Sequence, residues 1–192
     1  MGRMTPAEPP RRIHVFGASG SGVTTLGRAL AVRLRLEARH LDTDAFYWLE
    51  TDPPFTAKRA PEERVRLIEA EIHRAPSWVL SGSLCGWGDT LMPRFTRAVF
   101  LRLDPDVRMA RLAAREAERY GDRIFPGGDL REHHLEFMAW ARSYDVATAP
   151  TRSLDLHRRW MESLACPVCE LDSDRSVADL VAAVLGSEPE PS

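Results

Sequence analysis

The chain has 192 residues, a usual length for one domain, and its hydrophobic fraction of 44% supplies a core that needs neither disulfides nor a structural metal. Its 26 basic and 28 acidic residues give a net charge of −2, which argues against a general nucleic-acid binder because such proteins carry a basic excess. No run of about 18 apolar residues is present, so we expect no membrane-spanning helix and no membrane partner.

The two ends of the chain are predicted to lie outside the folded domain. Residues 1–11 carry three prolines and no apolar stretch, so they predict a disordered arm rather than a secretory signal. Residues 187–192 are polar and proline-bearing and predict a disordered tail. The 3 cysteines, an odd number, are typical of a reducing compartment. We therefore expect one domain over residues 12–186 in the cytoplasm.

The predicted elements alternate between strands and helices along the chain. Apolar runs predict buried strands at 13–16, 40–42, 78–80, 98–101 and 167–171. Helical spacing predicts helices over 23–36, from 61 onward, and over 106–120, 130–146, 153–163 and 177–185. This order is typical of an α/β protein with a parallel sheet of about five strands and helices on both faces. Ligands of such sheets bind at the carboxyl ends of the strands.

The loop after the first predicted strand has the spacing of a phosphate-binding loop. Residues 17–24, GASGSGVT, match G-x-x-x-x-G-K-[ST] at every position except the lysine. Glycines let backbone N–H groups turn inward, and the helix N-terminus adds positive partial charge, so the loop can hold phosphates. The alternative is a glycine turn that only joins strand to helix. The residues predicted to bind a nucleotide here are Gly17, Ser19, Gly20, Ser21, Gly22, Val23, Thr24 and Thr25.

Val23 stands where the motif has its lysine. That lysine reaches the β- and γ-phosphates, and a charge-assisted hydrogen bond is worth roughly 1.5–3 kcal/mol, which valine cannot supply. Either the charge comes from elsewhere or the phosphate is bound without catalysis. Lys58, the only lysine, precedes the second long helix together with Arg59 and is the sequence's candidate for this charge. The alternative is a solvated pair of surface cations.

With this loop, the chain resembles the small P-loop kinase superfamily, which contains the adenylate, shikimate and gluconate kinases. The stretch 40–48, HLDTDAFYW, is also similar to the DNA topology modulation protein-like kinases. The resemblance covers residues 13–185 and implies a three-layer P-loop NTPase fold with a small helical lid region at about 120–128. It further implies ATP and Mg²⁺ as cofactors and a small molecule or a nucleotide as the phosphate acceptor.

Two carboxylates follow the second predicted strand. Asp42 and Asp44 match the D-x-D of shikimate kinase-like enzymes, in which the first helps to hold Mg²⁺ and the second contacts or deprotonates the acceptor hydroxyl. The chemistry fits, because Mg²⁺ prefers oxygen ligands and a carboxylate beside an alcohol can take its proton. The resemblance therefore implies Thr24 and Asp42 as metal ligands and Asp44 as a catalytic residue. The alternative is a pair of acids in a solvated turn.

Arginines on the predicted helix 106–120 are the second group that the resemblance assigns. Arg108, Arg111, Arg115 and Arg119 are spaced to share one helix face. The lid of adenylate kinase-like enzymes is flanked by R-x-x-x-R, so Arg111 would lie against the adenine and Arg115 would reach the phosphates. Arg152 and Arg175 would add nucleotide contacts, the latter from an adenine-side loop after the fifth strand. The alternative is a solvated face paired with glutamates of the same helix.

The sequence thus predicts an ATP-dependent phosphotransferase that moves the γ-phosphate to a small acceptor. Its predicted catalytic residues are Asp44, Lys58, Arg111 and Arg115. The rival interpretation is a nucleotide-binding switch or degenerate kinase without transfer. Val23 favours this rival, as does Ser81, because it follows the third strand where many P-loop proteins carry an aspartate. A narrower alternative is an adenylate kinase proper.

Overall fold

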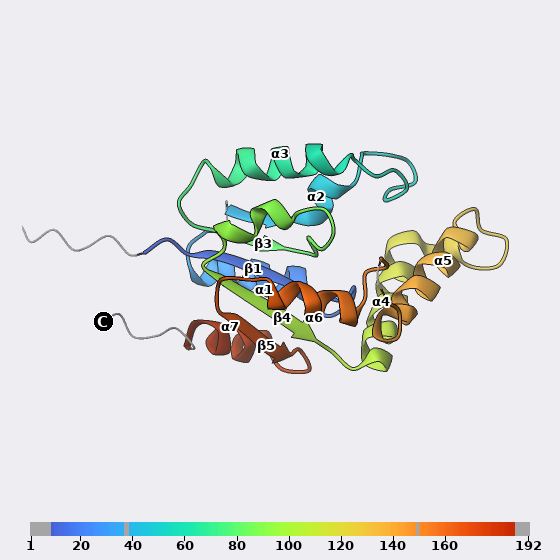
Figure 1. Cartoon of the computed structure of the whole chain (residues 1–192). Coiled ribbons are helices and arrows are strands. Elements are labelled where there is room, and N and C mark those ends of the chain that lie inside the picture. Colours follow the sequence, from blue (N-terminus) through green and yellow to red (C-terminus); the bar gives the residue numbers. More distant parts are fainter. Residues whose placement is uncertain (1–8, 37–38, 149, 187–192) are drawn as a thin grey trace, which may run out of the picture.

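A parallel sheet organises the computed structural model, which describes residues 9–36, 39–148 and 150–186. Its five strands are ordered β2-β3-β1-β4-β5, and each neighbouring pair is parallel (Figure 1). The strands are β1 (Arg12–Gly17), β2 (His40–Asp42), β3 (Trp78–Ser81), β4 (Arg97–Arg102) and β5 (Val168–Asp172). Because β1 is the central strand, the loop that follows it lies at the middle of the sheet's carboxyl edge.

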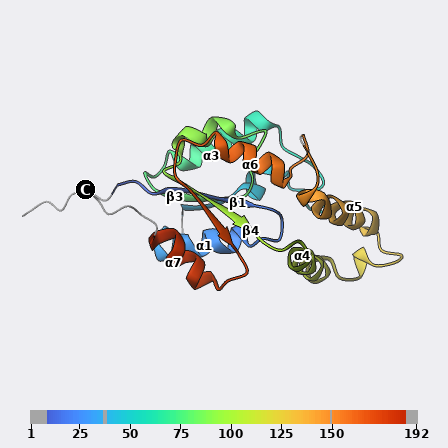
Figure 2. The same cartoon turned by 60° about the horizontal axis from the view of Figure 1, so that its bottom comes forward.

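The helices form a layer on each face of the sheet and a pair beyond its carboxyl edge. They are α1 (Val23–Arg33), α2 (Thr43–Tyr47), α3 (Pro61–Ile72), α4 (Pro105–Tyr120), α5 (Arg131–Arg142), α6 (Leu154–Glu162) and α7 (Val177–Gly186). Figure 2 shows α1 and α7 on one face of the sheet and α3 and α6 on the other, and both figures show α4 and α5 past the strand ends (Figures 1 and 2). The predicted three-layer α/β fold is confirmed. None of the described helices is long and apolar enough to cross a bilayer.

Local signals explain most of the element boundaries and the differences from the prediction. Asp104 caps α4 by accepting from the N–H groups of Asp106 at 2.9 Å and Val107 at 3.2 Å, as its position before Pro105 predicts. The predicted helix 130–146 instead ends at Arg142 and continues as a 3₁₀ turn. Sequence periodicity missed α2, because five residues are too few to show a helical repeat.

Successive residues of β1 point to opposite faces of the sheet and pack into two separate hydrophobic cores. Ile13 and Val15 pack with Leu26 and Leu30 of α1 and with residues of α7. Phe16 packs on the other face, with residues of α3 and α6. His14 also points to that face and stacks on Phe16, with ring centroids 5.1 Å apart. Side chains alternate along a strand, so a sheet covered on both faces buries every position of its central strand.

The predicted terminal segments and lid are placed as follows. Of the predicted arm, residues 1–8 lie outside the described residues, and so does the whole predicted tail 187–192. The Arg11 backbone N–H donates to Ser77 Oγ at 3.0 Å. The predicted lid, 120–128, is the connection between α4 and α5, and it begins with a 3₁₀ helix at Gly121–Ile124.

Two buried histidines make the stability of the fold depend on pH. Burial lowers the pKa of His14 to about 3, against a small opposing effect of its hydrogen bond with the Leu80 carbonyl. Burial, with the charge of Arg152, lowers the pKa of His157 to about 3 as well. The unfolded chain, where each pKa is near 6.5, binds these protons first as the pH falls. The free energy of unfolding therefore decreases from about pH 6.5 down through about pH 3.

We expect His14→Gln to flatten this dependence. Removal of one such titrating group should reduce the slope of the unfolding free energy against pH by up to about 1.4 kcal/mol per pH unit in the range from pH 6 to pH 4. Urea unfolding at several pH values measures the slope, and His73→Gln, at an exposed position, is the matched control. Equal slopes for His14→Gln and the native protein would contradict the assignment.

Candidate active site

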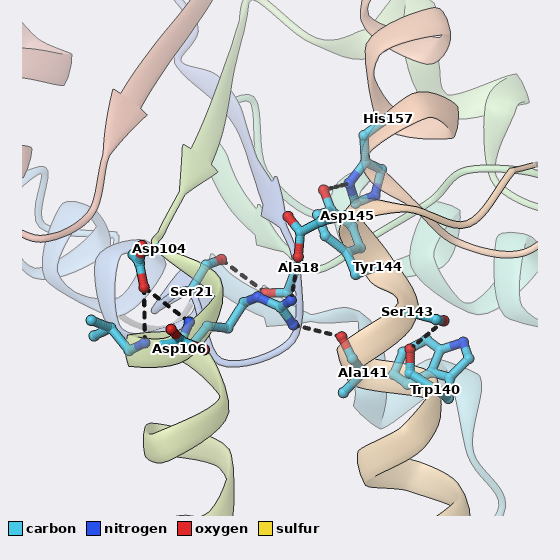
Figure 3. Close-up of polar contacts among 12 residues, drawn as sticks. Ala18, Ser21, Asp104, Asp106, Trp140, Ala141, Ser143, Tyr144, Asp145 and His157 are labelled. Atoms are coloured by element: carbon cyan, nitrogen blue, oxygen red, sulfur yellow. Dashed lines mark hydrogen bonds and ion pairs between the residues drawn. The ribbon is translucent and has the colours of Figure 1, made fainter.

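The loop between β1 and α1 is held in a closed conformation by its own contacts. Gly20 and Gly22 have φ of 85° and 88°, in the left-handed region that favours glycine. Gly20 also lies against α4, where a Cβ atom would come 2.9 Å from Leu112 Cγ. Within the loop, buried Ser21 donates from Oγ to the Ala18 carbonyl at 2.8 Å (Figure 3). These contacts fix the loop before any ligand binds.

The buried side chain of Arg108 packs against the loop between β1 and α1. Its guanidinium donates to the Ala141 carbonyl at 2.8 Å and pairs with Asp145 at 2.7 Å, at the end of α5 (Figure 3). The Arg108 backbone and side chain also lie against Gly20. The Arg108 side chain is only 1% exposed, so it differs from the three later arginines of the predicted stripe. It joins α4, α5 and the loop into one unit.

The N-terminus of α1 leaves its N–H groups free for an anion. The helix begins at Val23, and neither a side-chain cap nor an acidic residue occupies its first turn. Val23 itself packs against the core between the sheet, α1 and α7. Unpaired N–H groups and the helix dipole favour phosphate at such an end, but this loop has no charged side chain at position 23.

The two predicted metal ligands are in direct contact. Thr24 Oγ1 donates to Asp42 Oδ2 at 2.8 Å, and Asp42 Oδ1 accepts from the Asp44 backbone N–H at 3.1 Å, which caps α2. No cluster of three or more His, Cys, Asp or Glu that could hold a metal occurs in the described part of the chain. One hydroxyl and one carboxylate suit Mg²⁺, which takes few protein ligands and completes its shell with phosphate oxygens and water.

The protein environment shifts the pKa of Asp44. Its side chain is exposed in the first turn of α2, yet desolvation by the surrounding protein raises the pKa of its carboxyl group, and the charge of Asp42 raises it further. Arg152 and Arg115 act in the opposite direction. A raised pKa strengthens a carboxylate as a proton acceptor near neutral pH.

Arg152 is hydrogen-bonded to the phosphate loop and acts electrostatically on Asp44. Its Nη2 donates to Ser19 Oγ, and its guanidinium lies 4.7 Å from the ring centroid of Trp140. Burial lowers the pKa of Arg152, while the charge of Asp44 raises it. The structure thus brings together the phosphate loop, the Thr24 and Asp42 pair, Asp44 and Arg152.

The other predicted arginines are more exposed. Arg115 is 43% exposed and lies 3.3 Å from Glu116. The Arg111 guanidinium is 4.0 Å from the carboxylate of Asp174, in the loop after β5 that also carries exposed Arg175. Arg111 and Arg175 are therefore at the same side of the site, and their nucleotide contacts stay predictions.

Lys58 lies in the segment between α2 and α3. It is exposed on a hairpin-like segment and forms an isolated antiparallel bridge with Trp48. Within residues 9–36, 39–148 and 150–186 it has no hydrogen bond or ion pair with the loop. Its neighbour Arg59 is engaged with Glu63 at 3.0 Å and with the Phe46 carbonyl at 3.1 Å. A catalytic role for Lys58 stays a prediction.

A buried polar network beside Arg152 escaped the sequence analysis. His157 is hydrogen-bonded through Nε2 to Ser83 Oγ at 2.9 Å and through Nδ1 to Tyr144 OH at 2.7 Å. Figure 3 shows the second of these bonds, between α6 and the 3₁₀ turn that follows α5. Because burial keeps His157 neutral, the network fixes the segment that carries Arg152 without adding charge. No spacing in the sequence signals these contacts.

This chain is similar to one family model, to a Bacillus subtilis protein and to solved kinase structures. Residues 13–139 match the model of a family described as AAA domain. A Bacillus subtilis (strain 168) protein, "Uncharacterized protein YqaC", is 45% identical over 175 residues, which cover 91% of this chain and 96% of YqaC. Among solved structures, a gluconokinase from Sinorhizobium meliloti 1021 has a TM-score of 0.50 at 19% identity, covering 94% of this chain and 92% of that one. A shikimate kinase from Bacteroides thetaiotaomicron has a TM-score of 0.49 at 19% identity, covering 92% and 96%.

Thr24→Val tests the assigned metal ligands, because it keeps the side-chain shape and removes the hydroxyl. We expect the affinity for ATP in the presence of Mg²⁺ to fall about tenfold or more, since a bond to a charged group is worth roughly 1.5–3 kcal/mol. Affinity without Mg²⁺ should change less. Calorimetric titration measures both, with Thr24→Ser, which keeps the hydroxyl, as the control. Equal Mg²⁺ dependence in the two variants would exclude Thr24 as a ligand.

Proposed function

The chain belongs to the AAA domain family and has the kinase-like P-loop fold of nucleotide-binding phosphotransferases; from this premise we propose that it transfers the γ-phosphoryl group of ATP to a small-molecule acceptor or a nucleotide. One observation carries the proposal. Asp44 donates its backbone N–H to Asp42, which in turn accepts from Thr24, and its carboxylate lies within the electrostatic reach of Arg152.

The phosphate loop and the metal ligands account for binding of the donor. The free N–H groups at the start of α1 and the closed loop before it suit the phosphates of ATP. Thr24 and Asp42 would hold Mg²⁺, which neutralises phosphate charge when bound. Asp44 lies in the first turn of α2, which Asp42 caps by accepting from the Asp44 backbone N–H, so Asp42 would position both the donor site and the acceptor base.

Asp44 would orient the acceptor and take its proton. A bond forms between the acceptor oxygen and the γ-phosphorus while the bond from that phosphorus to the bridging oxygen breaks. ADP leaves with the electron pair, and the hydroxyl proton moves to the Asp44 carboxylate. Arg115, which acts electrostatically on Asp44 from α4, would contribute positive charge near the transferring group. This use of a base favours an acceptor that reacts through a hydroxyl group.

A nucleotide-binding protein without transfer is the second candidate, and two positions favour it. Val23 removes the charge of the motif's lysine, and Ser81 replaces a carboxylate at the end of β3. Ser81 Oγ is hydrogen-bonded with His40 Nε2 at 2.9 Å, so it is already engaged. This candidate predicts ATP binding with no transfer to any acceptor.

Asp44→Asn separates the two candidates. We expect transfer of labelled γ-phosphate to fall roughly 10²- to 10⁴-fold, the usual contribution of a general base, while ATP binding persists. A panel of sugars, hydroxy acids and nucleoside monophosphates, AMP included, supplies the acceptors. Glu50→Gln, at a nearby exposed position, is the matched control. Undiminished transfer in Asp44→Asn would refute the assigned base, and no transfer by the native protein would support the second candidate.

The pH dependence of transfer gives an independent check. A base must be ionised to accept a proton, so kcat/KM should fall on the acid side as Asp44 becomes protonated. Because burial and Asp42 raise its pKa, this limb should lie above the ordinary aspartate value of 3.8. Steady-state rates between about pH 4 and 8 measure it. A flat acid side over that range would contradict the role.

A further inference from the structure

Arg152 has a buried hydrogen-bond donor that nothing in the described structure satisfies. Nη2 donates to Ser19 Oγ in the phosphate loop, and the guanidinium lies over the Trp140 ring, 4.7 Å from its centroid. Its Nε atom, in contrast, is buried and has no hydrogen-bond partner among the described residues. An unsatisfied buried donor on a charged group is costly, so such an atom indicates a ligand that completes it.

The charge of Arg152 is also poorly compensated. Arginine stays protonated in proteins, and no ion pair to Arg152 is found in the described part of the chain. Asp44 is the carboxylate whose charge acts on it most strongly, and the other groups that favour its charged form are Tyr144, Cys85 and Tyr47. A desolvated cation that forms no ion pair within the described residues favours the binding of an anion.

Because Arg152 is hydrogen-bonded to Ser19, the anion would bind at the phosphate loop. Ser19 lies within the segment that the motif wraps around phosphates, between Gly17 and Gly22. At Val23 the loop has an apolar side chain packed into a core, so its own donors are all uncharged. We propose that Arg152 supplies, from the segment before α6, the positive charge that lysine supplies in the P-loop motif, and that it binds the terminal phosphates of ATP.

The proposal rests on the function proposed above and assigns the charge to Arg152 rather than Lys58. A guanidinium can make two parallel hydrogen bonds to phosphate oxygens, a geometry that an ammonium group lacks. Lys58 lies exposed in an antiparallel bridge with Trp48, and its neighbour Arg59 is held by Glu63. Arg152, by contrast, contacts the loop directly through its hydrogen bond to Ser19.

The test removes the guanidinium of Arg152 and, in a second variant, also places a lysine at position 23, where the motif has one. Calorimetric titrations with ATP, ADP and AMP, in the presence of Mg²⁺, are made on the native protein, Arg152→Gln, Arg152→Gln with Val23→Lys, and Lys58→Ala. We expect Arg152→Gln to weaken ATP binding roughly 10- to 100-fold and AMP binding much less. Val23→Lys in the same chain should restore most of the ATP affinity and part of the transfer activity. Arg158→Gln, an exposed position on α6, is the matched control.

Thermal unfolding of each variant shows whether a loss of ATP affinity comes from the lost charge or from an unfolded protein. If Arg152→Gln is unfolded at the assay temperature, Arg152→Lys replaces it, and a partial loss of ATP affinity that Val23→Lys repairs is the expected result. Native ATP affinity in the Arg152 variant, a loss that Val23→Lys leaves unrepaired, or a loss confined to Lys58→Ala would each overturn the proposal. A native protein that neither prefers ATP over AMP nor transfers phosphate would instead refute the proposed function itself.

Discussion

A loop of backbone N–H groups needs a full positive charge beside it to hold a triphosphate, and this chain carries valine where the motif provides that charge. The rest of the site is arranged around this constraint. Arg108 holds the loop against α4 and α5, Thr24 and Asp42 are joined across the start of α1 and the end of β2, and Arg152 reaches the loop from the segment before α6. The proposed activity depends on this last contact.

The scaffold explains why an arginine can reach the loop from so far along the chain. The helices α4 and α5 lie beyond the carboxyl edge of the sheet, and the chain then returns along α6 over the same face as α3 (Figure 2). The hydrogen bonds of His157 to Ser83 and Tyr144 fix this return on both sides of Arg152. Since buried His157 is neutral, these bonds position the segment without competing for the phosphate.

The sequence predicted those parts of the fold and site that depend on local patterns. Short runs located all five strands, although only β1, β3 and β4 are mostly buried, whereas β2 is half-buried and β5 alternates between exposed and half-buried residues. The glycine spacing located the loop, because the left-handed backbone at Gly20 and Gly22 favours glycine. The resemblance paired Thr24 with Asp42 as metal ligands, and the structure places their side chains in a hydrogen bond of 2.8 Å. The resemblance implied Arg152 as a nucleotide contact, but no local pattern could predict its hydrogen bond to Ser19, since that bond depends on how the segment before α6 packs against the loop. Spacing placed Arg108 on a helix face but could not show that α5 buries it.

A crystal structure with Mg²⁺ and a non-hydrolysable ATP analogue tests the central claim most directly. The account predicts the guanidinium of Arg152 within hydrogen-bond distance of the terminal phosphate, with Nε or Nη atoms as donors and the triphosphate wrapped by the loop before α1. A guanidinium turned away from the phosphates, or Lys58 in that position, would contradict it.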